Sequence, residues 1–391
     1  MTDRLYYSDS YLREFEASVV DLADEGRRVY LDRTAFYPTS GGQPFDTGVL
    51  GDVAVVDVVD EGERIAHLVA APLDEGPVTG RLDWDRRFDH MQQHTGQHLL
   101  SAVLAKSHEY RTVSVHFGRE SSTLDLDISA ISPEQVVAAE ARANAVVMEN
   151  RRVELAVEDA DSAAGLRKAS DRQGPLRIVT IQGLDRSACG GTHVRATGEI
   201  GPILVRKVER VRKIVRFEFL CGRRAVRRAR ADFDLLSRVA GLFSATAEEV
   251  PGLVEIQRTE LKEAGAARRE LEEAVSGYRA RELYDSTAPT HSGMRLVLLH
   301  EEAGPAQRLR GLAQALAAMP NAVLLATVRN PPAVLVAASA DSGIDAGQVL
   351  RAALERVGGR GGGSARLAQG TVGDAAALEP LVEAIRAGRA G

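Results

Sequence analysis

The segment from Gly222 to about Tyr284 constrains the fold more than any other feature of this chain. It is rich in Ala, Arg, Glu and Leu, and Pro251-Gly252 interrupts it. Such a segment is typical of long paired helices, and the break favours two antiparallel helices over one rod. We expect a helical hairpin over residues 222–286, with globular parts on both sides. Its apolar residues recur at near-heptad spacing, at Val254, Leu261, Ala264, Leu271, Val275 and Tyr278.

This apolar seam leaves the oligomeric state open, because it suits packing within the hairpin and pairing of two chains equally well. A second copy could also associate through the domain that follows the hairpin.

The globular parts differ in pattern. Residues 1–87 alternate short apolar and polar runs, which predicts a β-rich, barrel-like domain. Residues 88–221 combine strands with helices expected over 94–105 and 132–149, which predicts an α+β domain. Residues 287–391 alternate strand and helix signals, as in a small α/β domain. The predicted fold is therefore a multidomain α+β chain.

Composition places the protein among soluble globular chains. The 391 residues are 44% hydrophobic and 27% charged, with a formal net charge of −6. That sum does not indicate nucleic-acid binding, yet residues 206–230 hold eleven basic side chains against two acidic ones. Cys189 and Cys221 cannot form a disulfide framework, which fits a reducing compartment. With no leader-like N-terminus and no apolar run near about 18 residues, we expect a cytoplasmic protein without a membrane anchor.

Two pairs of metal-ligating residue types occur at the same separation. His94 and His98 would share one face of a helix, and Cys189 and His193 flank a turn that contains two glycines. Each pair alone is equally well explained as structural histidines and a small buried cysteine. Together they form a His₃Cys set, which suits one zinc ion per chain in a tetrahedral site.

These residues carry a family resemblance. His94-Thr95-x-x-His98-Leu99-Leu100, taken with Ser187-Ala188-Cys189-Gly190-Gly191-Thr192-His193-Val194, resembles the editing domain of alanyl-tRNA synthetase and the free-standing AlaX trans-editing proteins. The resemblance implies ATP-independent hydrolysis of serine, and in some members glycine, from wrongly charged tRNA(Ala). It also implies that His94, His98, Cys189 and His193 bind zinc. The order of domains matches the long form of AlaX.

Two further segments extend the resemblance. The segment from Thr34 to Pro44 resembles the glycine-rich N-terminal loop of the family, although Thr39-Ser40 stands where an acidic residue and a third glycine are common. This implies substrate contacts at Gly41, Gly42 and Gln43, and the alternative is a turn in a β domain.

Residues 358–370 resemble the C-terminal domain of alanyl-tRNA synthetase, a DHH-associated type. This implies tRNA contacts at Arg360, Gly361, Gly362, Gly363 and Arg366. Glycines beside arginines also expose backbone N–H groups to phosphate, and the alternative is a flexible loop without a ligand. A chain of this length that starts at the β domain leaves no room for an aminoacylation domain, so we expect no tRNA charging.

The implied reaction hydrolyses an ester, which requires an attacking water and stabilisation of an oxyanion. With one ligand displaced, zinc would have an open position for that water; with all four bound, it would organise the pocket. Thr95 and Gln97 are candidate catalytic groups that would bind the serine hydroxyl that alanine lacks, or else helix-surface polar residues. The basic residues 206–230 predict a track for the acceptor arm, or a solvated helix face.

Other functions remain as alternatives. A DHH-type phosphodiesterase would need an aspartate-rich manganese site, whereas Asp89-His90-Met91 matches only two of the three motif residues. A non-catalytic zinc- and tRNA-binding protein would keep the ligands without turnover. A deacylase of another mischarged tRNA would share the chemistry.

Overall fold

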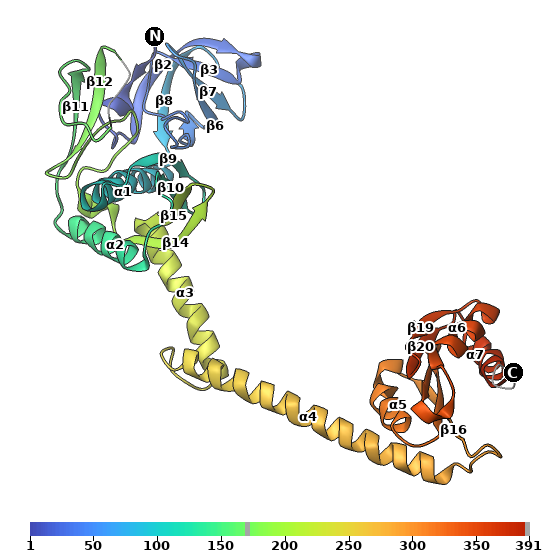
Figure 1. Ribbon diagram of the computed structural model, residues 1–391. Helices are drawn as coiled ribbons and strands as arrows, with labels where there is room; N and C mark the ends of the chain where they lie inside the picture. Colours follow the sequence, from blue (N-terminus) through green and yellow to red (C-terminus); the bar gives the residue numbers. More distant parts are fainter. Residues whose placement is uncertain (169–172, 388–391) are drawn as a thin grey trace. The chain divides into compact units, whose positions relative to one another are not determined.

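Figure 1 shows the computed structural model, which describes residues 1–168 and 173–387. The chain divides into two compact units, Met1–Val239 and Ala240–Gly391. The domain boundaries expected after residues 87, 221 and 286 stay predictions, and residues 169–172 and 388–391 of the expected domains lie outside the described part of the chain.

The first unit begins with a closed barrel in the strand order β2-β3-β7-β6-β5-β8. In β2 buried and exposed residues alternate, so that Phe15, Ala17 and Val19 pack inside. The β-rich, barrel-like prediction is confirmed. The barrel strands are β2 (Glu14–Ala23), β3 (Arg28–Leu31), β5 (Gly48–Leu50), β6 (Val53–Asp60), β7 (Ile65–Val69) and β8 (Gly76–Leu82). Outside it, β1 (Asp3–Arg4) pairs in parallel with β4 (Arg33–Thr34).

A 25-residue helix, α1 (Trp84–His108), forms the centre of the α+β part. It begins at Trp84 rather than at His94, because the Asp83 side chain caps it by accepting a hydrogen bond from the Arg86 N–H. The second helix, α2 (Pro133–Met148), opens with the expected capping box.

Two sheets accompany these helices, in the orders β14-β15-β10-β9 and β11-β12-β13. Side chains of α1, α2 and both sheets form one core that includes Leu99, Leu100, Val146, Val179 and Phe217. The strands are β9 (Thr112–Phe117), β10 (Ser122–Leu126), β11 (Val153–Asp159), β12 (Pro175–Ile181), β13 (Asp185–Ala188), β14 (Ile203–Val211) and β15 (Ile214–Cys221).

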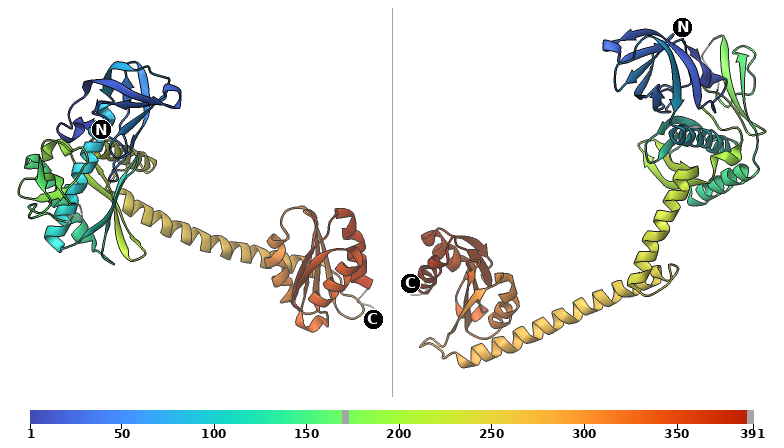
Figure 2. Two further views of the ribbon diagram at one scale, coloured as in Figure 1. Left: turned by 90° about the horizontal axis from the view of Figure 1, so that it is seen from above. Right: turned by 180° about the vertical axis from the view of Figure 1, so that it is seen from behind.

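Two long helices, α3 (Gly222–Leu242) and α4 (Val250–Ser286), form on either side of a break near the expected position (Figure 2). The division after Val239 falls within α3 and places α4 in the second unit, so the antiparallel hairpin expected over residues 222–286 stays a prediction. The seam of α4 is exposed, with Leu261 at 74% and Tyr278 at 78%. Helix α4 packs instead against the C-terminal domain, because its apolar contacts are near its end, where Ala280 is fully buried.

The C-terminal domain is an α/β sheet in the order β16-β17-β18-β20-β19, with one apolar core against α4 and α5 and another against α6 and α7. Its elements are β16 (Arg295–Ala303), α5 (Arg310–Ala317), β17 (Ala322–Asn330), β18 (Ala333–Ala338), α6 (Ala346–Val357), β19 (Arg360–Gly363), β20 (Leu367–Thr371) and α7 (Leu378–Ala387). Among the described residues, no helix has the length and apolar character needed to cross a membrane.

The glycine stretch forms the edge strand β19 rather than a flexible loop. A Cβ on Gly361 would lie 2.4 Å from the Cα of Gly370, and one on Gly363 would lie 2.3 Å from the carbonyl oxygen of Leu367. These glycines therefore let β19 approach β20 closely. An edge strand keeps one row of backbone groups unpaired, so this placement still offers N–H donors.

Candidate metal centre

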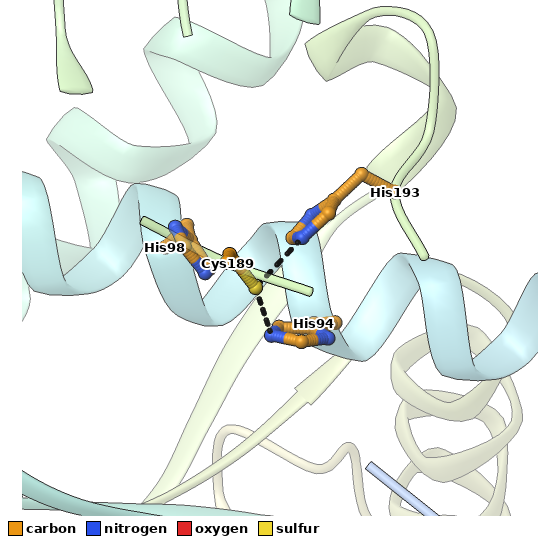
Figure 3. Close-up of side chains that lie close together, drawn as sticks. All are labelled: His94, His98, Cys189 and His193. Atoms are coloured by element: carbon orange, nitrogen blue, oxygen red, sulfur yellow. Dashed lines mark hydrogen bonds between the residues drawn. The ribbon is translucent and has the colours of Figure 1, made fainter. Parts of the chain in front are cut away.

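His94 and His98 share one face of α1, as their spacing predicts. Both are buried, and their ring centroids are 5.2 Å apart (Figure 3). Gly96 lies between them, and a Cβ there would lie 2.3 Å from the Sγ of Cys221 at the end of β15. Glycine at this position lets α1 pack closely on β15.

Cys189 and His193 lie in the turn that follows β13. A Cβ on Gly191 would lie 2.2 Å from the Cε1 of His94, so the turn can close against the helix only with glycine there. The guanidinium of Arg177 donates hydrogen bonds to the carbonyl oxygens of Cys189 and Gly191, both at 2.8 Å. Arg177 thereby fixes the turn that carries Cys189.

The two pairs meet. One ligand atom from each of His94, His98, Cys189 and His193 lies within 4.8 Å of all the others. The Sγ of Cys189 is 3.4 Å from the Nε2 of His94 and 3.3 Å from the Nε2 of His193. Tetrahedral zinc, with bonds of about 2.0 Å to nitrogen and about 2.3 Å to sulfur, places such ligand atoms about 3.6 Å apart. The donor set therefore fits a zinc ion.

Each histidine ring is held at its Nδ1 atom. The Nδ1 atoms lie 2.8 Å from Gln43 Oε1 for His94, 3.2 Å from Asp185 Oδ2 for His98, and 3.1 Å from Thr95 Oγ1 for His193. A partner at Nδ1 fixes the ring orientation and leaves Nε2 to face a metal. This is the arrangement that metal-ligating histidines usually have.

The electrostatics of the cluster favour a thiolate. Burial raises the pKa of the Cys189 thiol, but the imidazoles of His94 and His193 outweigh burial and hold that pKa well below its ordinary value. Burial lowers the pKa of His98, but Asp185 and Cys189 outweigh it and raise that pKa to about 9. Burial and the neighbouring His94 lower the pKa of His193 to about 3. Thiolate is the form in which cysteine binds metal.

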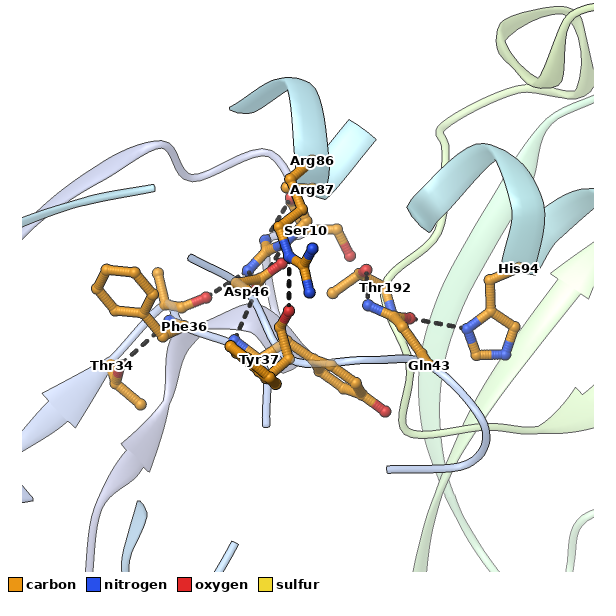
Figure 4. A network of polar contacts seen from close by, with 12 residues as sticks. Ser10, Thr34, Phe36, Tyr37, Gln43, Asp46, Arg86, Arg87, His94 and Thr192 are labelled. Atoms are coloured by element: carbon orange, nitrogen blue, oxygen red, sulfur yellow. Dashed lines mark hydrogen bonds and ion pairs between the residues drawn. The ribbon is translucent and has the colours of Figure 1, made fainter. Parts of the chain in front are cut away.

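The glycine-rich loop reaches the cluster through Gln43. This residue is fully buried. Its Oε1 contacts the Nδ1 of His94 and accepts a hydrogen bond from the Thr192 N–H at 3.2 Å. Its Nε2 donates to Thr192 Oγ1 at 2.8 Å (Figure 4). The structure thus gives Gln43 a place behind His94, whereas Gly41 lines the cavity described below. Gly42 has a φ of +85°, which favours glycine.

A buried ion pair ties this loop to α1. Arg87 and Asp46 have no exposed side-chain surface, and the Arg87 Nε donates to Asp46 Oδ2 at 3.0 Å. Asp46 Oδ2 also accepts from the Tyr37 N–H at 2.7 Å, and Arg87 donates to the Ser10 carbonyl oxygen at 2.9 Å. Figure 4 shows this network beside the Gln43–His94 contact. The barrel loop and the histidine helix are therefore locked together.

A cavity of about 780 Å³ opens beside the cluster, and His94, His98 and Cys189 are in its wall. Gln97 lines it as well, with its Nε2 donating to Ser101 Oγ at 2.8 Å. Thr95 is fully buried and contacts His193, so its place is that of a positioning residue. The catalytic roles predicted for Thr95 and Gln97 stay predictions.

Sequence reasoning missed three residues of this centre. Asp185 and Arg177 act through partners remote in sequence, and Arg167 donates from its Nε to Asp185 Oδ1 at 2.7 Å. Asp185 and Arg177 are single charged residues in strands and Arg167 lies in the segment before β12, so none of them gives a local sequence signal. Spacing alone could not have found them.

The remaining predicted binding residues lie elsewhere. The basic residues 206–230 fall on β14, β15 and the start of α3, and Arg360 and Arg366 belong to the second unit. Asp89 is ion-paired with Arg224 at 2.6 Å. In the described part of the chain, the His₃Cys cluster is the one group of such side chains able to hold a metal, which disfavours the phosphodiesterase alternative.

Comparison with known proteins agrees with this geometry. Residues 176–217 match the family "Threonyl and Alanyl tRNA synthetase second additional domain", and residues 294–387 match the DHHA1 domain. The alanyl-tRNA editing protein AlaX-L of Pyrococcus horikoshii is 30% identical over 95% of this chain and 95% of its own length. The chain belongs to the AlaX-L family. The region shared with this AlaX-L protein includes both the metal cluster and the C-terminal domain.

Alanine–tRNA ligases also match. Those of Pyrococcus furiosus and Pyrobaculum calidifontis are 34% and 35% identical over 98% of this chain, which spans 43% and 44% of their lengths. This AlaX-L family chain therefore spans less than half of those ligases. The crystal structure of the C-Ala domain from Aquifex aeolicus alanyl-tRNA synthetase matches 24% of this chain and 91% of its own at 25% identity, with a TM-score of 0.21.

Proposed function

We propose that this protein hydrolyses the ester that joins a wrong amino acid to tRNA(Ala), serine first and glycine second. The observation that carries the proposal is the buried His₃Cys cluster in the wall of a cavity of about 780 Å³. Membership of a family named for alanyl-tRNA editing supplies the substrate class. The protein would act in the cytoplasm, where translation takes place, without ATP and without charging tRNA itself.

We propose zinc as the resident metal, one ion per chain, held by His94, His98, Cys189 and His193. The mixed nitrogen and sulfur donors and their separations support zinc over magnesium or calcium. With all four side chains engaged, a bound ion would supply fixed positive charge at the cavity wall and hold the shape of that wall.

The protein's own groups provide the rest of the chemistry. Arg177 lines the cavity, and its Nη2 has no hydrogen-bond partner among the described residues. Its positive charge favours the oxyanion that forms when water attacks the ester carbonyl. Gln97 offers an amide for the hydroxyl of serine, and alanine, which lacks that hydroxyl, would leave such a group unpaired.

Contacts with the body of tRNA are also proposed. The excess of arginine and lysine over residues 206–230 supports phosphate binding. In the C-terminal domain, Arg360 to Gly363 form an edge strand with free backbone donors, and Arg366 follows it. We propose that this edge contacts tRNA.

Deacylation of Ser-tRNA(Ala), Gly-tRNA(Ala) and Ala-tRNA(Ala), with zinc quantified in the same preparation, tests the proposal. We expect rapid loss of serine, spared alanine, one zinc per chain, and no attachment of alanine to tRNA in the presence of ATP. Cys189→Ala should lose both zinc and activity. The Cys221→Ala variant should keep both, because the Cys221 sulfur packs on α1 at Gly96 but is outside the ligand set.

Two outcomes favour other functions. Zinc binding without cleavage of any ester would favour a non-catalytic zinc- and tRNA-binding protein. Cleavage of a different mischarged tRNA, with Ser-tRNA(Ala) spared, would favour a deacylase with another substrate.

A further inference from the structure

A second cavity of about 910 Å³ lies in the first unit, where the N-terminal turns of α1 and α3 meet the turn between β9 and β10. Its wall is rich in arginine, and we call it the cationic cavity. It shares no lining residue with the cavity of about 780 Å³ beside the His₃Cys cluster, which we call the metal cavity. The arginines of the cationic cavity are Arg86, Arg119, Arg223, Arg224 and Arg227.

The positive charge of this wall exceeds what its carboxylates neutralise. Asp85 pairs with Arg223 and Asp89 with Arg224, both at 2.6 Å. These pairs leave Arg86, Arg119 and Arg227 without a carboxylate partner among the described residues. Arg86 uses its Nε on a backbone carbonyl oxygen, and the exposed Arg119 and Arg227 have no polar partner within that same part of the chain. The wall therefore carries guanidinium groups that are free to bind an anion.

A buried histidine marks the same cavity. His90 is 5% exposed and lines the wall, and its Nδ1 has no hydrogen-bond partner among the residues described. Buried polar atoms are nearly always paired in folded proteins, so an unpaired one at a cavity points to a ligand. Burial, followed by Arg86 and Arg224, lowers the pKa of His90 to about 3, as expected in a strongly positive surrounding.

The cationic cavity and the metal cavity are neighbours. His90 and His94 are one helical turn apart on α1, which is about 6 Å along the axis. Pro44 lines the cationic cavity, and the preceding residue, Gln43, holds His94. Successive turns of the same helix therefore line the two cavities.

We propose that the cationic cavity binds a backbone phosphate of the tRNA substrate, just before the aminoacylated end that occupies the metal cavity. This inference rests on the proposed function. Guanidinium groups bind phosphate through paired N–H donors, and proteins that bind single-stranded RNA have positively charged grooves that follow its backbone. The N-terminus of the 21-residue α3 adds partial positive charge at the same wall.

Binding of an uncharged, fluorescently labelled RNA hairpin that reproduces the acceptor stem and 3′ end of tRNA(Ala) tests the inference. Arg119→Ala/Arg227→Ala should raise Kd about tenfold or more and lower the salt slope by about one to two. Arg238→Ala is the matched control: the exposed Arg238 lies on the same helix, outside both the cavity and the basic residues 206–230, and its loss should change Kd less than about twofold. Trimming the 3′ nucleotides from the RNA should abolish the difference between wild type and the double variant.

Other results would overturn the inference. The inference would be overturned if the double variant kept the Kd and salt slope of the wild type. It would also be overturned if inorganic phosphate saturated the cavity without displacing the RNA. The experiments distinguish failure of the RNA-binding inference from failure of the proposed hydrolysis. If the wild type cleaves no Ser-tRNA(Ala) but the double variant loses RNA affinity, the RNA-binding role of the cavity stands and the proposed hydrolysis is rejected. If both proteins cleave Ser-tRNA(Ala) with the same KM, the proposed hydrolysis stands and the role of the cavity is rejected.

Discussion

Replacement of Gln43 by leucine tests how the barrel loop supports the metal cluster. Leucine fills a similar volume but removes the acceptor for His94 Nδ1 at 2.8 Å and for the Thr192 N–H at 3.2 Å. Loss of such a partner typically weakens metal binding by about 10- to 100-fold, or about 1.4–2.8 kcal/mol. The two unpaired buried donors should also lower the free energy of unfolding of the metal-free protein, each by about 1–3 kcal/mol.

The assay is competition with a chelator of known zinc affinity, alongside urea unfolding of the metal-free protein. Gln93→Leu is the matched control, because Gln93 is equally buried on α1 and its side chain makes hydrogen bonds of 2.9 and 3.0 Å to the backbone of Cys221 rather than to a metal ligand. It should lose similar stability and keep its zinc affinity. Equal zinc affinity in Gln43→Leu and wild type, or equal losses in both variants, would refute the role given to Gln43.

Three further perturbations have defined outcomes. Arg87→Met should lower the free energy of unfolding by about 3–5 kcal/mol, because Asp46 stays buried without its cation; a loss under about 1 kcal/mol in urea unfolding would contradict this. Burial lowers the pKa of His67 to about 4, so below its ordinary value of about 6.5 the unfolded chain takes up a proton first. Stability should therefore fall as pH drops from about 6.5 to about 4, by roughly 3 kcal/mol, and His67→Gln should flatten this part of the urea-unfolding profile. Gly191→Ala should purify with well under one zinc per chain, because its Cβ would lie 2.2 Å from His94; full occupancy by metal analysis would count against the packing described.

Local sequence signals predicted the parts of the structure that depend on neighbouring residues. The spacing of His94 and His98 fixes one helix face, and Ser132-Pro133 marks the start of α2. Alternation in the first 87 residues predicted the barrel, because a half-buried strand repeats every second residue.

The remaining features depend on contacts between distant segments. Gln43, Asp185 and Arg177 reach the cluster only after three segments have folded together, and no spacing rule links them. The near-heptad pattern of α4 shows that one helix face is apolar, but it does not identify the surface that packs on that face. The glycines of β19 left a flexible loop open as an alternative, because their close contact with β20 arises from the sheet and not from the local sequence.

The four ligands come from two segments that are far apart in the sequence, and this separation has a consequence for the abundance of the protein in the cell. Under the proposed metal binding, an ion joining His98 to Cys189 would close a loop of about 90 residues, and closing a loop of that size stabilises the folded state by about 4–5 kcal/mol. That stabilisation is comparable to the entire folding stability of many domains. Chains made during zinc starvation would open more often and be degraded sooner. The amount of this protein would then follow zinc supply at a constant rate of synthesis.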